Sequence, residues 1–406
     1  MTEKSHTQKT IAIIGGGPAG LMAAEILATA GMAVTIYDHK PSVGRKFLMA
    51  GRGGLNLTHS EDFEPFMQRY GSAAPNRLPA IQNFTPTQLR QWCEDLGQET
   101  FIGSSGRVFP KSLKASPLLR AWLERLNALG VTINLNHHWT GWDNDALTFT
   151  TPQGPITVKP DATLLALGGG SWAKLGSDGS WTELLKNKGI PVAPLRPSNS
   201  GFTVQWSDIL KTRFAGQPLK TVTLSYGNQT IPGDMMITET GIEGGPVYAL
   251  SSALRNDLDA EKPATLHIDL KPGLTPDAIR QKLSTPRGGQ SFSTYLQKSL
   301  GLPPISINLL RECAGDCSAM GPDKLARILK ALPLTVSGTA SIDRAISTSG
   351  GVTFDSIDEN YMLKKLPGIF VAGEMLDWEA PTGGYLLQAC FSTAVAAANG
   401  ILKHLK

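Results

Sequence analysis

The chain has 406 residues, more than one average domain, and its 38 basic and 34 acidic residues leave a formal charge of only +4 at pH 7. So small a charge excludes proteins that bind nucleic acid or anionic membranes through net charge alone. Four scattered cysteines exclude a disulfide framework, and residues 1–10 are polar and unlike a secretory leader. We expect a cytoplasmic protein of two or three domains, without a membrane anchor because no apolar run reaches about 18 residues.

The first chain segment has the pattern of a strand, a turn, a helix and a second strand. Residues 11–14 are apolar, residues 15–20 read Gly-Gly-Gly-Pro-Ala-Gly, and residues 21–30 are rich in alanine. Residues 33–37 are β-branched or aromatic and end at Asp38. This order predicts a βαβ unit that opens the chain.

The glycine turn of this unit satisfies the dinucleotide-binding fingerprint. Gly15 permits a tight turn, Gly17 lets a pyrophosphate approach the backbone, and Gly20 allows the helix to pack closely on the strand. Pro18 suits the first helical turn, and Asp38 is placed to accept hydrogen bonds from a ribose. The alternative is a glycine-rich turn with a solvent-exposed aspartate. The fingerprint alone leaves FAD and NAD open, since both present an adenosine diphosphate.

The C-terminal segment favours FAD. Residues 368–377, Gly-Ile-Phe-Val-Ala-Gly-Glu-Met-Leu-Asp, and residues 381–389, Pro-Thr-Gly-Gly-Tyr-Leu-Leu-Gln-Ala, resemble the second flavin-contacting signature of two-dinucleotide-binding flavoproteins. A strand would end at Gly373, and Glu374 or Asp377 would accept hydrogen bonds from the ribityl chain. The helix that starts after residue 382 would direct its positive end at the flavin pyrimidine edge. The alternative is an ordinary strand, loop and helix.

The middle of the chain predicts a continuation of this domain and then an insertion. Helices are expected at 87–96 and 117–129, a β-meander at 131–135, 147–150 and 156–158, and a buried parallel strand at 162–167. From Pro191 the chain becomes rich in proline and strand-like segments, whereas 276–332 is helical in pattern and has an excess of Lys and Arg. We predict an α/β protein with a Rossmann-like FAD-binding domain (1–190 and 342–406) and an inserted, mixed β, barrel-like plus helical domain (191–341).

Seven segments together resemble the BaiN/RdsA family of NAD(P)/FAD-dependent oxidoreductases over the whole chain. Besides the fingerprint at 15–20 and the segment 373–388, they are Gly-Arg-Lys at 44–46, the glycine-rich Asn-x-Thr segment at 51–58, and the stretches 106–116, 165–179 and 349–352. One departure is that family members usually carry Gly-Gly-Gly-Arg-Cys-Asn where this chain has Gly51-Arg-Gly-Gly-Leu-Asn56. The displaced arginine and missing cysteine indicate a divergent subgroup, so the reaction of no single relative transfers.

The fingerprint and the resemblance together imply the residues that contact FAD. The set is Gly15, Gly17, Pro18, Ala19, Gly20, Asp38, His39, Arg45, Lys46, Arg52, Gly53, Asn56, Trp139, Gly168, Gly373, Glu374, Asp377, Gly383, Gly384, Tyr385 and Leu386. Arg45, Lys46 and Arg52 are expected to bracket the phosphates and the flavin ring. No second fingerprint is present, so NAD(P)H would dock transiently as reductant.

The sequence is compatible with three functions. The first is reduction of an unidentified small molecule, the second is reduction of an RNA uridine to dihydrouridine, and the third is redox sensing without catalysis. Basic clusters at 107–125 and 271–330 would assist an RNA partner, or they are solvated faces. The sequence leaves the oligomeric state open.

Weaker candidates compete with structural roles. Cys390 is a candidate proton donor or a small buried hydrophobe. The i, i+4 spacing of Cys313 and Cys317 would place them on one face of a helix, but no second Cys or His pair nearby completes a zinc site, so we expect no metal. The segment 137–139 is expected to contact adenine through its backbone, with Trp142 on the same strand as 131–135, or to form a surface hairpin.

Overall fold

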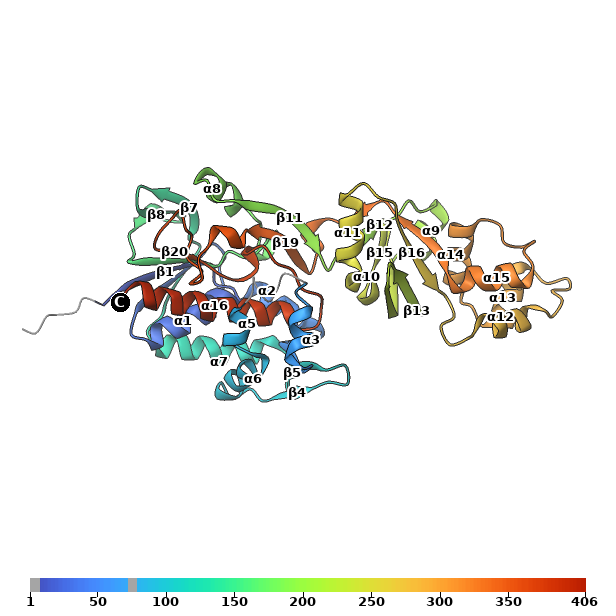
Figure 1. Ribbon diagram of the computed structural model, residues 1–406, viewed down its shortest axis with the longest axis horizontal. Helices are drawn as coiled ribbons and strands as arrows, with labels where there is room; N and C mark the ends of the chain where they lie inside the picture. The colour runs from blue at the N-terminus through green and yellow to red at the C-terminus, as the bar shows by residue number, and fades with distance from the viewer. Residues whose placement is uncertain (1–7, 72–78) are drawn as a thin grey trace, which may run out of the picture. The chain divides into compact units, whose positions relative to one another are not determined.

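The computed structural model describes residues 8–71 and 79–406, the side chain of Arg52 excepted. It divides into two compact units: unit 1 is Met1–Arg196 with Ser347–Lys406, and unit 2 is Pro197–Ile346 (Figure 1). The boundaries fall a few residues later than the predicted 191 and 341. The reason is that Val192–Ser198 forms strand β11, which pairs with β19 (Ser347–Val352) in a two-stranded sheet.

Unit 1 is built on a parallel sheet of five strands in the order β20-β10-β1-β2-β6. Strands β1 and β2, which belong to the βαβ unit, are neighbours in this sheet. Strand β20, which comes last in the sequence, forms one edge of the sheet. The apolar side chains of β1 and β10 are almost completely buried, as expected of central strands in a sheet covered on both faces. The strands are β1 (Thr10–Ile14), β2 (Ala33–Asp38), β6 (Thr132–Leu135), β10 (Ala162–Leu165) and β20 (Ile369–Val371).

Three helices from distant parts of the chain pack together in unit 1 (Figure 1). They are α1 (Pro18–Thr29), α7 (Ala115–Ala128) and α16 (Tyr385–His404). Helix α16 has the length and mean hydropathy of a membrane span, although polar residues such as Gln388 and Asn399 interrupt its apolar sequence. However, 67% of its apolar window is buried inside the unit, and α1 packs along it, so it serves as a core helix here.

The β-meander was predicted with the wrong first strand. Residues 132–135 form β6 and pair in parallel with β2, whereas the meander consists of β7 (His138–Asp143), β8 (Ala146–Thr151) and β9 (Gly154–Val158). The chain changes sheet at Asn136, which has a positive φ of 57°. Trp142 therefore lies on β7 and not on the preceding strand. Periodicity alone could not assign the partner of a short strand.

The remaining elements of unit 1 are short. They are α2 (Arg45–Ala50), η1 (Gly51–Gly53), β3 (Thr58–His59), α3 (Phe63–Gln68), α5 (Ala80–Asn83), α6 (Pro86–Asp95), β4 (Thr100–Ile102), β5 (Arg107–Pro110), η2 (Ala173–Leu175), α8 (Trp181–Asn187), η4 (Phe354–Ser356) and η5 (Gly373–Met375). Strand β5 pairs with both β3 and β4 in a small antiparallel sheet.

Unit 2 contains a seven-stranded antiparallel sheet in the order β17-β16-β13-β14-β15-β12-β18. Its two end strands are successive pieces of one segment, separated only by Ser337. The sheet therefore curls back on itself, which gives the barrel-like form, although its pairings are antiparallel and not mixed. The strands are β12 (Phe202–Thr203), β13 (Pro218–Tyr226), β14 (Gln229–Ile237), β15 (Gly241–Glu243), β16 (Ala264–Asp269), β17 (Leu332–Val336) and β18 (Gly338–Thr339).

Helices complete unit 2 around its own hydrophobic core. The first half of the insertion contains helices as well as strands, and the second half is helical, in the region 276–332. The four helices of that half begin at N-cap or N1 residues that the sequence displays, for example Thr275-Pro276. The helices are α9 (Asp208–Phe214), α10 (Gly245–Ala249), α11 (Ser251–Asp259), α12 (Pro276–Leu283), α13 (Phe292–Leu300), α14 (Pro304–Ala314) and α15 (Pro322–Lys330), with η3 (Ile342–Arg344) at the end.

Candidate functional site

The glycine turn between β1 and α1 has the geometry that the fingerprint requires. Gly15 has a φ of +106°, and a Cβ there would lie 2.3 Å from the carbonyl oxygen of Ala166. A Cβ at Gly20 would lie 1.9 Å from the oxygen of Gly15, so helix and strand touch at backbone distance. At Gly17, by contrast, a Cβ would meet no protein atom within 4 Å. Gly17 thus keeps open space beside the N-terminus of α1, where unpaired N–H groups attract anions.

A cleft in unit 1 brings the two ends of the chain together. The turn before α1 and the segment after β20 line the same cleft. At Gly373, where φ is +83°, a Cβ would come within 2.8 Å of the Cβ of Ala19. The predicted residues that line this cleft are Gly15, Gly17, Pro18, Ala19, Asp38, His39, Arg45, Lys46, Gly168, Gly373, Glu374 and Cys390.

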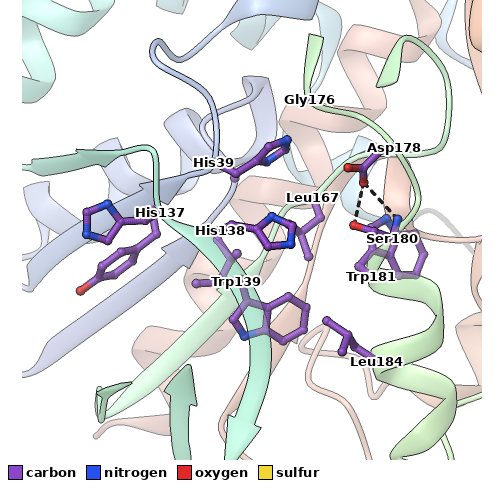
Figure 2. Close-up of a pocket in the computed structure, with 13 residues that line it drawn as sticks. His39, His137, His138, Trp139, Leu167, Gly176, Asp178, Ser180, Trp181 and Leu184 are labelled. Atoms are coloured by element: carbon purple, nitrogen blue, oxygen red, sulfur yellow. Dashed lines mark hydrogen bonds between the residues drawn. The ribbon is translucent and has the colours of Figure 1, made fainter. Parts of the chain in front are cut away.

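A second pocket continues from this cleft and shares Gly15, His39, Leu167 and Gly176 with it. Figure 2 shows its side chains, which come from the ends of β1 and β2, the start of β7, the segments after β10 and before α8, and α8 itself. The rings of His39 and His138 meet edge to face, with centroids 5.7 Å apart. This pocket has both flat rings and polar groups, the combination that a nucleotide base and its ribose need.

The carboxylate of Asp38 is held at the junction of the two pockets. Its Oδ2 accepts a hydrogen bond from the backbone N–H of Gly16 at 2.8 Å, and its Oδ1 accepts one from the backbone N–H of Lys40 at 2.8 Å. Each oxygen retains a lone pair for another donor. The position at the carboxyl end of β2 therefore presents a fixed acceptor to a ribose hydroxyl.

Several buried polar atoms in this region lack a hydrogen-bond partner within the described chain. They include His39 Nε2, Trp139 Nε1, Ser177 Oγ and Arg45 Nε. Such atoms are rare in folded proteins and commonly mark a missing ligand or water. Their spread along both pockets fits FAD, whose adenine, ribose and phosphates supply many polar atoms. The residues present therefore fit the cofactor that the sequence predicts.

Three ionisable groups of the second pocket are shifted in pKa, and burial raises the pKa of one of them, Tyr37. Burial lowers the pKa of His39 below its usual value, with partial opposition from Asp38, so the imidazole is neutral at pH 7. Burial would raise the pKa of Asp178, but hydrogen bonds from the backbone and hydroxyl of Ser180 lower it overall. The pocket thus offers one neutral imidazole and one fixed carboxylate.

The ammonium group of Lys46 binds other side chains of the protein. Its ammonium donates to Glu374 Oε2 at 2.8 Å and to Ser171 Oγ at 2.7 Å, while Glu374 Oε1 accepts from the N–H of Thr348 at 3.0 Å. The Glu374 side chain is only 8% exposed. This pair fastens α2 to the segment after β20, a role that differs from the predicted bracketing of phosphate. Arg45 remains the basic side chain with a free Nε on the cleft.

Cys390 lies on α16 and lines the cleft, but its thiol is buried. Burial raises the pKa of this thiol well above its usual range, and the charge of Glu374 adds to the rise. Cys390 therefore stays protonated at neutral pH.

Several predicted contacts do not line either pocket. They are Gly20, Gly53, Asn56, Asp377, Gly383, Gly384, Tyr385 and Leu386. The side chain of Arg52 lies outside the described part of the structure. Gly384 has a φ of +93° and packs its backbone on Thr58, and the Tyr385 ring stacks on His59. These residues secure the start of α16 against β3.

The tyrosine at the start of α16 belongs to a polar network. Its hydroxyl donates to Glu61, which also accepts two hydrogen bonds from Arg69, at 3.1 and 2.8 Å. The Tyr70 hydroxyl donates to the Tyr385 carbonyl oxygen at 2.7 Å. Burial and the neighbouring Glu61 raise the pKa of Tyr385, so the phenol remains protonated. The network orders the N-terminus of α16.

One family model, described as the HI0933-like protein Rossmann domain, matches residues 9–400. The chain belongs to this family. The resemblance to BaiN/RdsA flavoproteins is thereby confirmed, and the family is one of FAD-dependent oxidoreductases.

Two curated relatives match almost from end to end. A 3-dehydro-bile acid Δ(4,6)-reductase of Clostridium scindens is 26% identical over 95% of this chain and 97% of its own length. A ribosomal RNA dihydrouridine synthase of Haemophilus influenzae is 25% identical over 96% of this chain and 97% of its own length.

Two solved structures have the same fold at low identity. A flavocytochrome c3 fumarate reductase is 14% identical, covers 99% of this chain and 79% of its own, and gives a TM-score of 0.54. A 3-ketosteroid Δ1-dehydrogenase of Sterolibacterium denitrificans is 12% identical, covers 98% and 100%, and gives 0.53. The family thus shares its α/β architecture with other flavoenzymes.

Some pocket residues were missed by sequence reasoning. Ser42, Ser177 and Asp178 line the pockets but were not named as contacts. The Gly-Ser-Asp-Gly segment at 176–179 was noted only as a family match; its two glycines, both at positive φ, were the available signal for a backbone near a ligand. Ser42 offered no such signal.

The basic cluster at 107–125 is partly neutralised. Lys111 pairs with Glu99, and Arg125 binds Glu25 at 2.9 Å and the carbonyl oxygen of Asp95. These partners lie on α1 and around α6, outside the sequence range of the cluster, so the sequence alone did not reveal them.

Proposed function

We propose that this protein is an FAD-dependent reductase that takes its electrons from NADH or NADPH. The observation that carries the proposal is the single cleft lined by the turn at Gly15–Gly17 and by Gly373–Glu374 from the other end of the chain. Bound FAD would supply hydride transfer, which protein side chains cannot perform alone. The resemblance of the chain to two reductive flavoenzymes supports the same reaction class.

Each part of the chain has a distinct task in this proposal. The N-terminus of α1 and Arg45 would hold the pyrophosphate, and Asp38 would orient the adenosine ribose. The Lys46–Glu374 pair would fix the backbone after β20 beside the ribityl chain. The buried, protonated Cys390 thiol would exclude water and present a proton to the cleft.

Anaerobic mixing of the FAD-loaded protein with NADH or NADPH tests the electron donor. We expect the visible absorbance of oxidised flavin to disappear with one of the two nicotinamides at a saturable rate. Reduction of the same sample by dithionite is the control that the flavin is reducible. Flavin that stays oxidised with both nicotinamides but is bleached by dithionite would contradict the proposal.

A second candidate is reduction of an RNA uridine to dihydrouridine. The observation that favours it is the relative named ribosomal RNA dihydrouridine synthase, matched over 96% of this chain. Two exposed lysines of unit 2, Lys282 and Lys298, have no acidic partner in the described chain and favour an anionic polymer as partner. Comparison of dihydrouridine in ribosomal RNA from strains with and without this gene tests it, and equal content would reject it.

A further inference from the structure

A groove between helices α12 and α13 of unit 2 is open to solvent and polar. Figure 1 shows these helices beside α15 in the helical part of the unit, and α12 packs on both. The groove is lined by Lys282 from α12, by Thr285 and Gln290 from the connecting loop, and by Tyr295, Lys298 and Ser299 from α13. Cations therefore stand on both walls, with hydroxyl and amide groups between them.

Several acidic residues of this part of unit 2 have partners other than the groove lysines. Asp277 and Asp323 both bind Arg280, at 3.0 and 3.7 Å. Glu312 accepts from Ser207, and Asp316 accepts from Ser318.

Asp269 pairs with Lys330 at the base of the helices. Within the described residues, neither Lys282 nor Lys298 has an acidic partner, and both are exposed. The two groove lysines thus have no carboxylate partner in the described chain, unlike Lys111 and Arg125 of the cluster at 107–125.

The groove also contains an aromatic ring held in place. The Tyr295 hydroxyl donates a hydrogen bond to the carbonyl oxygen of Leu283, which ties the ring to the end of α12. Tyr295 is half-buried, so part of the ring is accessible. Fixed aromatic rings beside cations stack the unpaired bases of single-stranded nucleic acid.

We propose that this groove binds the phosphodiester backbone of single-stranded RNA. Lys282 and Lys298 contact phosphates, Tyr295 stacks a base, and Thr285 and Ser299 supply hydroxyls for the ribose 2′-OH. Further cations without acidic partners in the described chain, Lys324 and Arg327, lie on α15 next to α12. An array wider than one phosphate fits a polymer better than a small anion. The inference deepens the RNA candidate but does not depend on the flavin chemistry of unit 1.

The test measures the affinity of the full-length, FAD-loaded protein for a fluorescein-labelled 20-nucleotide RNA by anisotropy at several salt concentrations. Lys282→Glu/Lys298→Glu should weaken binding roughly tenfold or more, because two exposed contacts become repulsive. Neutral Lys282→Gln/Lys298→Gln should lower the slope of log K against log salt by about 1.4, at about 0.7 per phosphate contact. Lys211→Glu/Lys220→Glu on α9 and β13 is the charge-matched control and should bind like the wild type.

Three results would overturn the inference: no RNA binding by the wild type, equal loss in the control, or tighter binding of DNA of the same sequence. Reduction of the flavin by NAD(P)H is measured on the same samples. It should be equal in all variants, so failure of the reductase proposal would show in every sample and failure of the RNA groove only in the binding curves.

Discussion

At the scale of single residues, Gly15 and Gly17 are glycines for different reasons. A Cβ at Gly15 collides with Ala166 and meets an unfavourable φ, whereas a Cβ at Gly17 points into empty space beside α1. We expect Gly15→Ala to lower the free energy of unfolding of the cofactor-free protein by about 1–3 kcal/mol. Gly17→Ala should leave it unchanged but weaken FAD binding on the order of tenfold, ~1.4 kcal/mol. Denaturant titration and FAD titration of both variants check this, and equal loss of stability would contradict it.

The Lys46–Glu374 pair gives a second prediction. Lys46→Gln leaves a carboxylate that is 8% exposed without its cation, so we expect the free energy of unfolding to fall by about 2 kcal/mol. The control is Lys186→Gln, which breaks the exposed Lys186–Glu183 pair on α8 and should cost less than about 0.5 kcal/mol. Equal effects of the two substitutions in urea denaturation would show that the buried pair is not structural.

The two glycines were predictable from sequence because their demands are local to one turn. The partner of Lys46 was not, because Glu374 lies 328 positions away and either residue could equally have bound the cofactor. Sequence reasoning therefore located the residues of the cleft better than it assigned their contacts.

At the scale of elements, Asp161 joins the start of β1 to the loop before β10. It accepts hydrogen bonds from Lys9 Nζ and from the N–H and hydroxyl of Thr10, which lower its pKa from 3.8 to about 2. A depressed pKa means that the unfolded chain binds the proton more tightly. The stabilising effect of Asp161 is thus complete above pH 3.8 and is lost as the pH falls toward 2.

We therefore expect Asp161→Asn to lower the thermal midpoint at pH 5–7 and to differ less from the wild type as the pH is lowered from 4 toward 2. Melting curves followed by circular dichroism over this range measure the difference. A gap between the two proteins that grows on acidification would contradict the assignment of these hydrogen bonds.

The elements themselves were largely predictable, but their partners were less so. The strand at 132–135 was predicted from its residue pattern. Its parallel pairing with β2 was not, because β2 lies about 95 positions earlier in the chain and the two strands are joined by a long crossover. Helix α16 extends over 20 residues, because its many small residues are apolar enough to continue a buried helix without forming an obvious apolar run.

At the scale of the whole molecule, the division into two units was predicted from the proline-rich, strand-like sequence that begins near Pro191. Its exact position depended on β11, an extended segment with prolines that pairs with β19 and that sequence pattern alone assigns to neither unit. Because the cleft is lined by segments on both sides of the insertion, FAD binding should require both parts of unit 1.

FAD that binds only the folded protein should raise the free energy of unfolding of that protein. At a free FAD concentration of 100 times Kd, the expected gain is about 2.7 kcal/mol. Unfolding curves of the apoprotein with and without FAD measure this, and Gly17→Ala should gain less at the same FAD concentration. An unchanged midpoint on addition of FAD would contradict a specific site.

The most direct measurement is the identity and amount of cofactor released when the purified, FAD-reconstituted protein is denatured. The account predicts FAD, one molecule per chain, with the adenine dinucleotide intact. Release of no flavin after reconstitution, or retention of FMN in place of FAD, would contradict a site formed by the glycine turn at one end of the chain and the Gly373 segment at the other.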